Sequence, residues 1–155
     1  MPKLKVFLSG GMSDIPEKDS KKWRRLFKQA KHINVSSAYY AEQYSFINPT
    51  TLYKPSKPYD PTLEKEAMAY DLFCVKQADV IVVNFNSLSS IGTAQELMLA
   101  YTLNKPIIGM IEKNKYEQLH PWYKQECIKI FTYTPDKLED TINEIIEYVW
   151  RFKND

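Results

Sequence analysis

Two short stretches of the chain are apolar throughout, VIVV at residues 80–83 and PIIGMI at residues 106–111. A strand with one face in water alternates apolar and polar residues, whereas a strand that is apolar throughout has both faces covered. Segments with a helical spacing of apolar residues lie between the strands, so the cover is expected to be helices on both faces of a parallel sheet. This pattern constrains the fold more than any other feature of the sequence.

Strand and helix signals alternate along the whole chain. Five strands are predicted, at residues 5–9, 44–49, 79–84, 106–111 and 128–133. Helices are predicted at residues 17–31, 62–77, 93–104, 115–126 and 135–152. The predicted fold class is α/β, with one doubly wound, five-stranded parallel sheet in the flavodoxin-like or Rossmann-like order 2-1-3-4-5 and helices on both faces. The 155 residues are expected to form a single domain, 1–155.

Composition and cysteine and histidine spacing bear on which partners and which cellular compartment are expected. A net charge of +2 is too small to indicate a nucleic-acid polymer or a membrane as partner. No stretch approaches ~18 apolar residues and the N-terminus lacks a signal-peptide pattern, so a cytoplasmic, unanchored protein is expected. Cys74, Cys127, His32 and His120 show no metal-binding or redox spacing. We therefore expect reduced thiols and no metal ion at these residues.

The densest basic cluster falls in the predicted helix 17–31. It consists of Lys21, Lys22, Arg24 and Arg25. A helix face in water is the expected explanation, against the alternative of a phosphate-binding patch.

Residues 34–61 fit the alternation poorly. They include five tyrosines (Tyr39, Tyr40, Tyr44, Tyr53 and Tyr59) and four prolines around the second strand. In such a sheet, ligands bind outside the carboxyl ends of the strands, where the loop after this strand lies. A flap over the substrate and a contact between subunits both remain open.

The carboxyl ends of three predicted strands supply candidate ligand-binding residues. They are Ser9-Gly10-Gly11, Asn84–Gly92 and Glu112. Gly10-Gly11 would let backbone N–H groups approach a phosphate or a sugar. The turn is not a P-loop, because no Gly-Lys-Ser/Thr follows, and it lacks the third glycine of a dinucleotide fingerprint.

Asp71 lies in the predicted helix 62–77, on the same face as Ala67, Cys74 and Val75. That face is expected to pack on the sheet, where an unpaired carboxylate costs free energy. A functional carboxyl group and a structural, paired one both remain open.

Glu96 allows two interpretations. Thr93-Ala-Gln-Glu96 matches the capping box S/T-x-x-E, which predicts a structural role at the start of a helix. In the first helical turn the dipole would also lower the pKa of Glu96 and keep the carboxylate ionised. An ionised, oriented carboxylate at the strand ends is what a nucleophile acting on a glycosidic bond requires.

Several motifs occur in the order that one enzyme family shows. They are DLFCVKQADVIVVNFNSLSSIGTAQELMLAYTLNKPII at residues 71–108, FLSGG at 7–11 and INP at 47–49. The long stretch has an aspartate, Ala-Asp before a strand, Ser-x-Gly-x-x-x-Glu and finally Lys-Pro. The sequence thereby resembles the nucleoside 2-deoxyribosyltransferase family, which includes the related deoxynucleoside 5′-monophosphate N-glycosidases.

The resemblance implies roles for individual residues. Glu96 falls on the catalytic glutamate that attacks the anomeric carbon and holds the sugar covalently, and Asp71 on the aspartate that assists departure of the base. Ser90 falls on a position where transferases tend to carry an aspartate that binds the sugar and the monophosphate N-glycosidases a serine that holds the 5′-phosphate. The expected substrate-binding residues are Ser9, Gly10, Gly11, Asn84, Ser90 and Gly92.

Two departures from the family pattern leave the branch open. The tyrosine that many transferases place in the first strand has no match in Val6-Phe7-Leu8, and no arginine follows in Ser9-Gly10-Gly11-Met12. Ser90 favours a nucleotide substrate, whereas the missing arginine argues against one.

The resemblance implies cleavage of the N-glycosidic bond of 2′-deoxynucleosides or their 5′-monophosphates through a glycosyl–Glu96 intermediate, with transfer to another nucleobase. Hydrolysis of nucleoside 5′-monophosphates, an NAD-type glycohydrolase and a non-enzymatic nucleotide-binding module are the alternatives. The implied reaction needs no metal or organic cofactor, and a small-molecule nucleoside or nucleotide is the expected partner. A homo-oligomer is also expected, since family members complete each pocket from a neighbouring subunit, and Tyr39, Tyr40, Trp122 and Tyr123 are candidate contacts.

Overall fold

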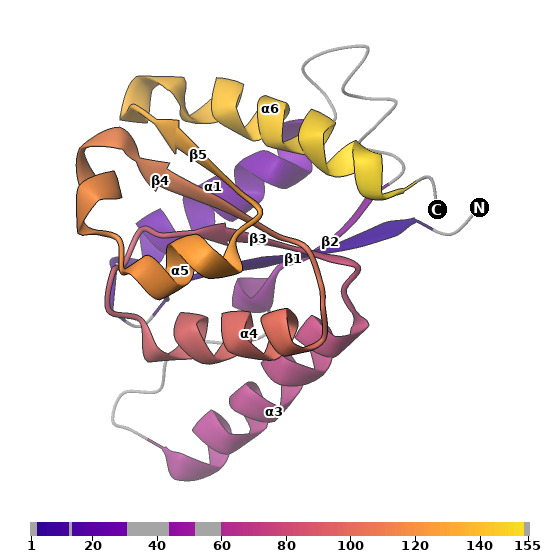
Figure 1. The fold of residues 1–155 in the computed structure, drawn as a ribbon. Helices are drawn as coiled ribbons and strands as arrows, with labels where there is room; N and C mark the ends of the chain where they lie inside the picture. Colours follow the sequence, from indigo (N-terminus) through magenta and orange to yellow (C-terminus); the bar gives the residue numbers. More distant parts are fainter. Residues whose placement is uncertain (1–2, 13, 31–43, 52–59, 154–155) are drawn as a thin grey trace.

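A five-stranded, all-parallel sheet forms the centre of the protein (Figure 1). The computed structural model describes residues 3–12, 14–30, 44–51 and 60–153. The strand order is β2-β1-β3-β4-β5, as predicted. The strands are β1 (Leu4–Gly10), β2 (Tyr44–Ile47), β3 (Val80–Asn84), β4 (Ile107–Glu112) and β5 (Lys129–Tyr133).

Helices cover both faces of this sheet, which confirms the predicted doubly wound arrangement. Figure 1 shows α1 and α6 on one face and α3, α4 and α5 on the other. The α-helices are α1 (Glu17–Gln29), α3 (Pro61–Gln77), α4 (Ile91–Thr102), α5 (Pro121–Glu126) and α6 (Leu138–Val149). Short 3-10 helices are η2 (Pro49–Thr51), η3 (Lys113–Gln118), η4 (Pro135–Lys137) and η5 (Trp150–Phe152).

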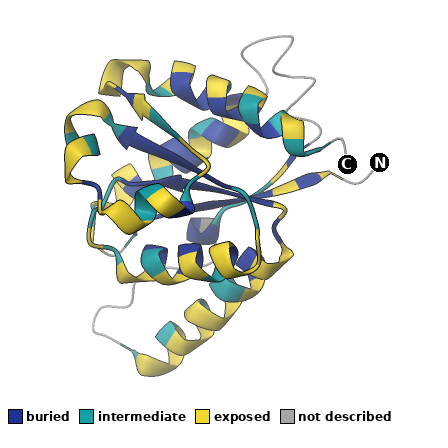
Figure 2. Cartoon of the chain, in the orientation of Figure 1, coloured by how far each residue is buried: buried dark blue, intermediate teal, exposed yellow. Residues whose placement is uncertain are grey.

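The core has two layers, one on each side of the sheet. Within β3, Val82 packs toward α1 and α6, whereas Ile81 and Val83 pack toward α3 and α4. β3 is buried along its whole length, as its colour in Figure 2 shows, so both of its faces need apolar side chains. This two-sided burial explains why the VIVV stretch has no alternation.

Two predicted helices have different boundaries in the structure. The segment predicted as one helix at 115–126 is divided into η3 and α5. Pro121 disfavours a helical backbone at His120, and the Nδ1 of His120 instead accepts a hydrogen bond from the backbone N–H of Trp122 (3.2 Å). The predicted helix at 135–152 is likewise three consecutive pieces, η4, α6 and η5.

Most of segment 34–61 lies outside the described residues, so the flap and the subunit contact both remain predictions. Tyr39, Tyr40, Tyr53 and Tyr59 belong to that part of the chain. Tyr44 is described: it is buried at the start of β2, and its hydroxyl donates to the carbonyl of Ile146 in α6 (2.6 Å).

Two further expectations concern thiols and membrane spans. Cys74 is buried, Cys127 is half-buried, and both are free thiols, as expected. Over the described ranges, none of the helices has the length and apolar character to cross a bilayer.

Candidate active site

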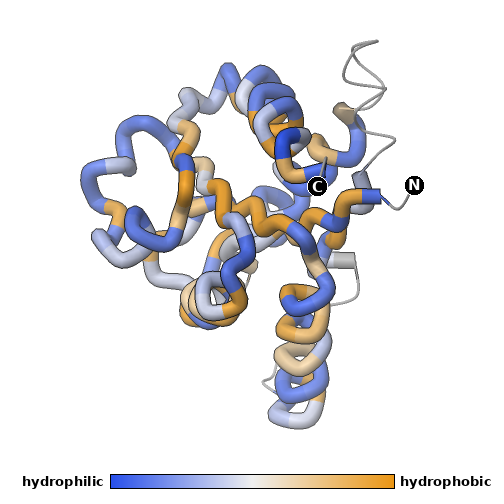
Figure 3. The backbone as a smooth tube through the Cα atoms, turned by 45° about the vertical axis from the view of Figure 1, so that its right-hand side comes forward, coloured by the Kyte–Doolittle hydropathy of each residue, from blue (hydrophilic) through white to orange (hydrophobic). Residues whose placement is uncertain are grey.

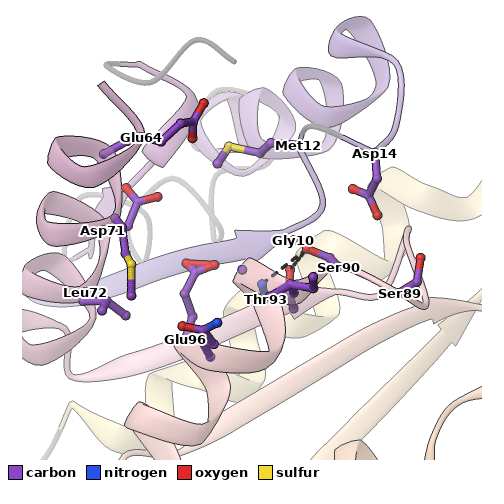
Figure 4. A pocket seen from close by; sticks show the side chains of 15 residues that line it. Gly10, Met12, Asp14, Glu64, Asp71, Leu72, Ser89, Ser90, Thr93 and Glu96 are labelled. Carbon is purple, nitrogen blue, oxygen red and sulfur yellow. Dashed lines mark hydrogen bonds between the residues drawn. The ribbon is translucent and has the colours of Figure 1, made fainter. Parts of the chain in front are cut away.

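A cavity of about 360 Å³ opens at the carboxyl edge of the sheet, where ligands bind in folds of this class. Its wall combines Gly10 at the end of β1, Asp71 on α3 and Glu96 on α4 (Figure 4). The Gly10–Asn84 register places the ends of β1 and β3 side by side, so the loops that follow both strands reach the same space. Segments far apart in the sequence therefore meet here.

The helix that carries Glu96 begins earlier than predicted. Ser90 is the N-cap of α4, and its Oγ accepts a hydrogen bond from the backbone N–H of Thr93 (3.3 Å). The hydroxyl of Thr93 donates to the same oxygen (3.0 Å), so Thr93 lies inside the helix. Glu96 is consequently in the second turn, and the capping-box interpretation is wrong.

Glu96 lies in an environment that favours its protonated form. Its side chain is 7% exposed, and one carboxylate oxygen, Oε1, accepts a hydrogen bond from the hydroxyl of Ser9 (3.4 Å). The other oxygen, Oε2, is buried and has no hydrogen-bond partner among the described residues. Burial first, and then the neighbouring Asp71, raise the pKa of Glu96 to about 8, against the opposing effects of Arg24 and Ser9. The prediction that Glu96 has a lowered pKa is therefore wrong, because burial outweighs the causes that lower it.

Asp71 faces the same space from the neighbouring helix (Figure 4). It is half-buried, and burial raises its pKa to about 6 although Arg24 opposes the shift. Its Oδ1 has no hydrogen-bond partner in the described part of the chain. A buried oxygen without a partner costs free energy, so a structural pairing within these residues does not account for this carboxyl group.

Arg24 is the residue that sequence reasoning placed wrongly. It is 0% exposed, whereas its neighbours Lys22 and Arg25 are exposed as expected. Its guanidinium lies behind the end of β1 and donates to the carbonyls of Leu8 (3.1 Å) and Gly10 (3.0 Å). The sequence did contain a sign that Arg24 is buried, because Arg24 lies three residues before the apolar Phe27 and thus on the same helix face.

The predicted substrate-binding residues divide into two groups. Gly10, Ser90 and Gly92 line the cavity, and Ser9 lies behind Glu96. A methyl group at Gly92 would meet no atom within 4 Å, so the absence of a side chain there leaves open space beside Glu96, four residues along the same helix face.

Gly11 and Asn84 are not among the residues that line this cavity. The N–H of Gly11 donates instead to Oδ1 of Asn86 (3.0 Å), which ties the loop after β1 to the loop after β3. Asn84 is buried and lines a separate cavity of about 410 Å³, together with Trp23 and Tyr133. The strand end was predicted correctly, but the direction of the Asn84 side chain was not available from the sequence.

A metal centre finds no support in the arrangement of side chains. Within the described ranges, no group of three or more histidine, cysteine, aspartate and glutamate residues is placed to hold a metal ion. The chemistry that the cavity offers is that of carboxyl groups, and two of them, Glu96 and Asp71, have raised pKa values.

The chain was compared with known proteins. No family model matches the sequence, and no curated protein sequence matches it either. Solved structures do match, at low sequence identity. A 2-deoxyribosyltransferase from Bacillus psychrosaccharolyticus has a TM-score of 0.62 at 17% identity, with 86% of this chain and 95% of that chain covered.

Two further structures share the fold. A CMP N-glycosidase from Clostridium botulinum has a TM-score of 0.53 at 17% identity, with coverage of 93% of this chain and 98% of that chain. A molybdenum cofactor binding protein from Rippkaea orientalis has a TM-score of 0.51 at 15% identity, with coverage of 97% and 99%. A fold alone does not fix a function. The chain has the fold of a 2-deoxyribosyltransferase and of a CMP N-glycosidase, and at that level the resemblance to the nucleoside 2-deoxyribosyltransferase family is confirmed.

Proposed function

We propose that the protein cleaves the N-glycosidic bond of 2′-deoxynucleosides through a covalent deoxyribosyl–Glu96 intermediate and transfers the deoxyribosyl group to another nucleobase. One observation carries the proposal: the carboxyl groups of Glu96 and Asp71, from two different helices, meet at one cavity and each has a buried oxygen without a described partner. Perturbed carboxyl groups that share a cavity are typical of catalytic sites.

In the first step, a carboxylate oxygen of Glu96 attacks the anomeric carbon. The new carbon–oxygen bond forms as the carbon–nitrogen bond breaks, and the electron pair leaves with the base. Asp71 donates the proton that the departing base takes up. In the second step, a nitrogen of the acceptor base attacks the same carbon, the ester to Glu96 breaks, and Asp71 accepts the proton. This double displacement is the chemistry of retaining glycosidases.

The reaction requires one proton on the pair of carboxyl groups, on Asp71 and not on Glu96. The negative charge of Asp71 raises the pKa of Glu96, so a state with both groups ionised is disfavoured. With raised pKa values of about 8 for Glu96 and about 6 for Asp71, the pair holds a single proton between those two pH values, and the higher pKa places it mostly on Glu96. The reactive arrangement, with the proton on Asp71, is then the minor form of the singly protonated pair. Near-neutral pH is therefore the expected working range.

The charges around the cavity favour a nucleoside over its 5′-monophosphate. Four carboxyl side chains line it, those of Asp14, Glu64, Asp71 and Glu96, and the described lining contains no lysine or arginine. Such a lining repels a phosphate dianion.

A second candidate is hydrolysis of nucleoside 5′-monophosphates. Ser90 favours it, because its hydroxyl lies at the cavity wall and the structurally similar CMP N-glycosidase has this kind of activity by name. Water would then take the place of the acceptor base in the second step. No specific contact among the described residues favours an NAD-type glycohydrolase or a non-enzymatic binding module. One protein with this fold is, however, a cofactor binder by name.

The test is incubation with a panel of deoxynucleosides and their 5′-monophosphates, with and without an acceptor base. A new nucleoside that appears only with the acceptor supports transfer, and free base without acceptor supports hydrolysis. Intact-protein mass spectrometry should show a deoxyribosyl adduct on the wild type and none on Glu96→Ala. Asp71→Asn should lower turnover by ~10²–10⁴-fold, most for bases that are poor leaving groups.

The matched control is Glu126→Gln. Glu126 is also a buried glutamate with an unpartnered oxygen, but it lies on α5 and is not among the residues that line the cavity. This variant should keep wild-type turnover. Wild-type activity in Glu96→Ala would overturn the proposed nucleophile.

A further inference from the structure

The guanidinium of Arg24 is buried without a carboxylate in contact. Its three nitrogens donate to the carbonyls of Leu8 (3.1 Å), Gly10 (3.0 Å) and Ser20 (2.7 Å). The ion pairs found among the described residues are Lys21–Glu17 and Lys137–Asp140, and neither involves this arginine. A buried charge with only neutral partners is costly, so its retention calls for a compensating charge nearby.

Two of these carbonyls belong to the part of β1 that extends beyond β2. The N–H and C=O of Lys5 both bond Asp79, on the β3 side, so Leu8 and Gly10 direct their carbonyls toward the β2 side. β2 ends at Ile47, opposite Phe7. Arg24 therefore satisfies backbone groups that none of the described strands reaches, and it fixes the end of β1.

Only the backbone of β1 separates this cation from the cavity. Gly10 lines the cavity, and a methyl group at Gly10 would lie 3.4 Å from Nη2 of Arg24 and 3.1 Å from Trp23. The lack of a side chain lets the guanidinium come close to the cavity wall from the α1 side. On the opposite side of the sheet, the hydroxyl of the adjacent Ser9 donates to Glu96.

We propose that Arg24 is a positioning residue, whose buried charge behind Gly10 keeps the carboxyl pair of Glu96 and Asp71 in the singly ionised state that the proposed reaction needs. This inference rests on the proposed function for its catalytic consequence, but the pairing of charges is independent of it. The residue acts through the electric field and through the end of β1, and it does not contact the cavity itself.

The electrostatics agree with this geometry. Burial lowers the pKa of Arg24 to about 10, so the guanidinium is protonated at neutral pH, and Glu96 and Asp71 are the two groups that oppose the lowering. The positive charge of Arg24 in turn lowers the pKa of both Glu96 and Asp71, against the larger effect of burial. The other titratable side chains at the cavity, Asp14 and Glu64, are acidic as well. Among the described groups that line or back the cavity, Arg24 supplies the positive charge.

The decisive variant is Arg24→Met, which removes the charge and keeps an apolar side chain in the buried position. Both limbs of the pH profile of kcat/KM should move upward by about one pH unit or more, since an opposite charge nearby typically shifts a pKa by that amount. Arg24→Lys keeps a cation and should leave the limbs closer to the wild type. Arg25→Met is the matched control, because it removes the same charge from an exposed position of the same helix. Limbs that stay in place in Arg24→Met, as in Arg25→Met, would overturn the proposal.

A second measurement does not depend on activity. The stability of the wild type, Arg24→Met, Glu96→Gln and the double variant is measured by denaturant unfolding between pH 6 and 9. The decrease in the free energy of unfolding caused by Arg24→Met should become larger as the pH rises when Glu96 is present. In the Glu96→Gln background this increase with pH should be smaller. If Arg24→Met alone does not fold, the double variant should recover folded protein. Equal losses in both backgrounds, or a double variant that also fails to fold, would show that Arg24 acts through its carbonyl contacts alone and overturn the inference. This result stands whether or not glycosidic cleavage is found, so the two proposals fail separately.

Discussion

The hydroxyl of Ser9, at the end of β1, donates a hydrogen bond to Oε1 of Glu96 on α4 across 3.4 Å. The family resemblance implies a tyrosine in the first strand that orients the nucleophile, but Val6-Phe7-Leu8 offers none. Ser9 is buried and lies on the same strand, so it supplies a hydroxyl to the carboxylate from the position after Leu8. Strand β1 therefore contacts Glu96 without a tyrosine.

Ser9→Ala should lower kcat by about tenfold and leave the fold intact. The lost interaction is a hydrogen bond to an ionisable group, which typically contributes ~1.5–3 kcal/mol, and the 3.4 Å distance puts it at the weak end. Because this hydrogen bond lowers the pKa of Glu96, which is about 8, the alkaline limb of the pH profile should also move upward. Steady-state kinetics from pH 5 to 9 check both effects. An unchanged alkaline limb would mean that the hydroxyl does not act on the carboxylate.

Glu96→Gln should make the folded protein more stable above neutral pH. The pKa of Glu96 is raised from 4.5 to about 8 in the folded state, so the folded state retains a proton that the unfolded state has released. The contribution of this group is therefore fully present below about pH 4.5 and is lost as pH rises to about 8. One pKa unit corresponds to about 1.4 kcal/mol, so we expect a gain of at least about 1 kcal/mol at pH 8.

Urea unfolding of the wild type and Glu96→Gln at pH 5 and pH 8 provides the measurement. Glu147→Gln, an isosteric change at an exposed position of α6, is the control and should change stability little at either pH. Asp71 adds a similar but smaller dependence, between its ordinary value of 3.8 and about 6. A variant no more stable than the wild type at pH 8 would contradict the burial argument.

Gly92→Ala should stabilise the protein and weaken substrate binding. A methyl group at this position meets no atom within 4 Å, and replacing a helical glycine by alanine typically stabilises by ~0.4–1 kcal/mol. The same methyl group enters the open space beside Glu96, so KM for the best substrate should rise severalfold. Gly109→Ala is the contrasting control, because its methyl group would lie 2.9 Å from Phe85 and should destabilise. An unchanged KM for Gly92→Ala would place the substrate elsewhere in the cavity.

Ser90→Ala should lower stability and affect nucleosides and 5′-monophosphates equally. Ser90 is the N-cap of α4, and loss of such a cap costs ~0.5–2 kcal/mol. Deoxynucleosides should be the better substrates of the wild type, because four carboxyl side chains line the cavity. Ser89→Ala is the control: it removes a hydroxyl from the same cavity wall, but Ser89 is not the N-cap of α4. A loss of stability in Ser90→Ala alone would therefore come from the lost cap. A selective loss of monophosphate activity in Ser90→Ala would instead assign its hydroxyl to the phosphate and favour the N-glycosidase alternative.

The functional unit is expected to be a homo-oligomer that uses the exposed apolar surface of α3 and α4. Exposed apolar side chains on these two helices include Leu63, Met68, Tyr70, Phe73, Met98 and Tyr101. Figure 3 shows apolar residues along α3, and Figure 2 shows that much of this helix is exposed. Large exposed apolar patches mark interaction sites. Phe73→Glu should shift the protein to a smaller species in light scattering and reduce activity.

Trp122→Glu is the comparison for that experiment. Trp122 and Tyr123 were both predicted as subunit contacts. Trp122 is 69% exposed on α5, so it is available for such a contact. Tyr123 instead packs against Phe85 in the core, with ring centroids 5.0 Å apart. An effect of Trp122→Glu alone would place the contact on α5 and not on α3. A monodisperse, fully active wild-type monomer would contradict the oligomer.

The fold and part of the site could be predicted from local patterns. Two-sided burial leaves a direct mark on sequence, because both faces of a central strand need apolar residues. The positions of Gly10 and Glu96 at the carboxyl edge followed from the element order, whereas Asp71 was assigned through the family resemblance; all three line one cavity. Helix boundaries followed less directly from the sequence. The start of α4 was misplaced because Ser90 and Thr93 are both good caps, and the choice between them depends on the backbone that enters the helix.

The sequence by itself determined which elements form, in which order they pair, and that Glu96 lies at the ligand edge. Only the tertiary structure decided the electrostatics of the site. The pKa of a carboxyl group depends on how much water it keeps and which charges face it, and both are set by residues distant in the sequence. Arg24 shows the difference most clearly. Four basic residues within five positions indicate a solvated helix face. In the structure, β2 ends before the carbonyls of Leu8 and Gly10 on β1, and Arg24 donates hydrogen bonds to both from inside the core.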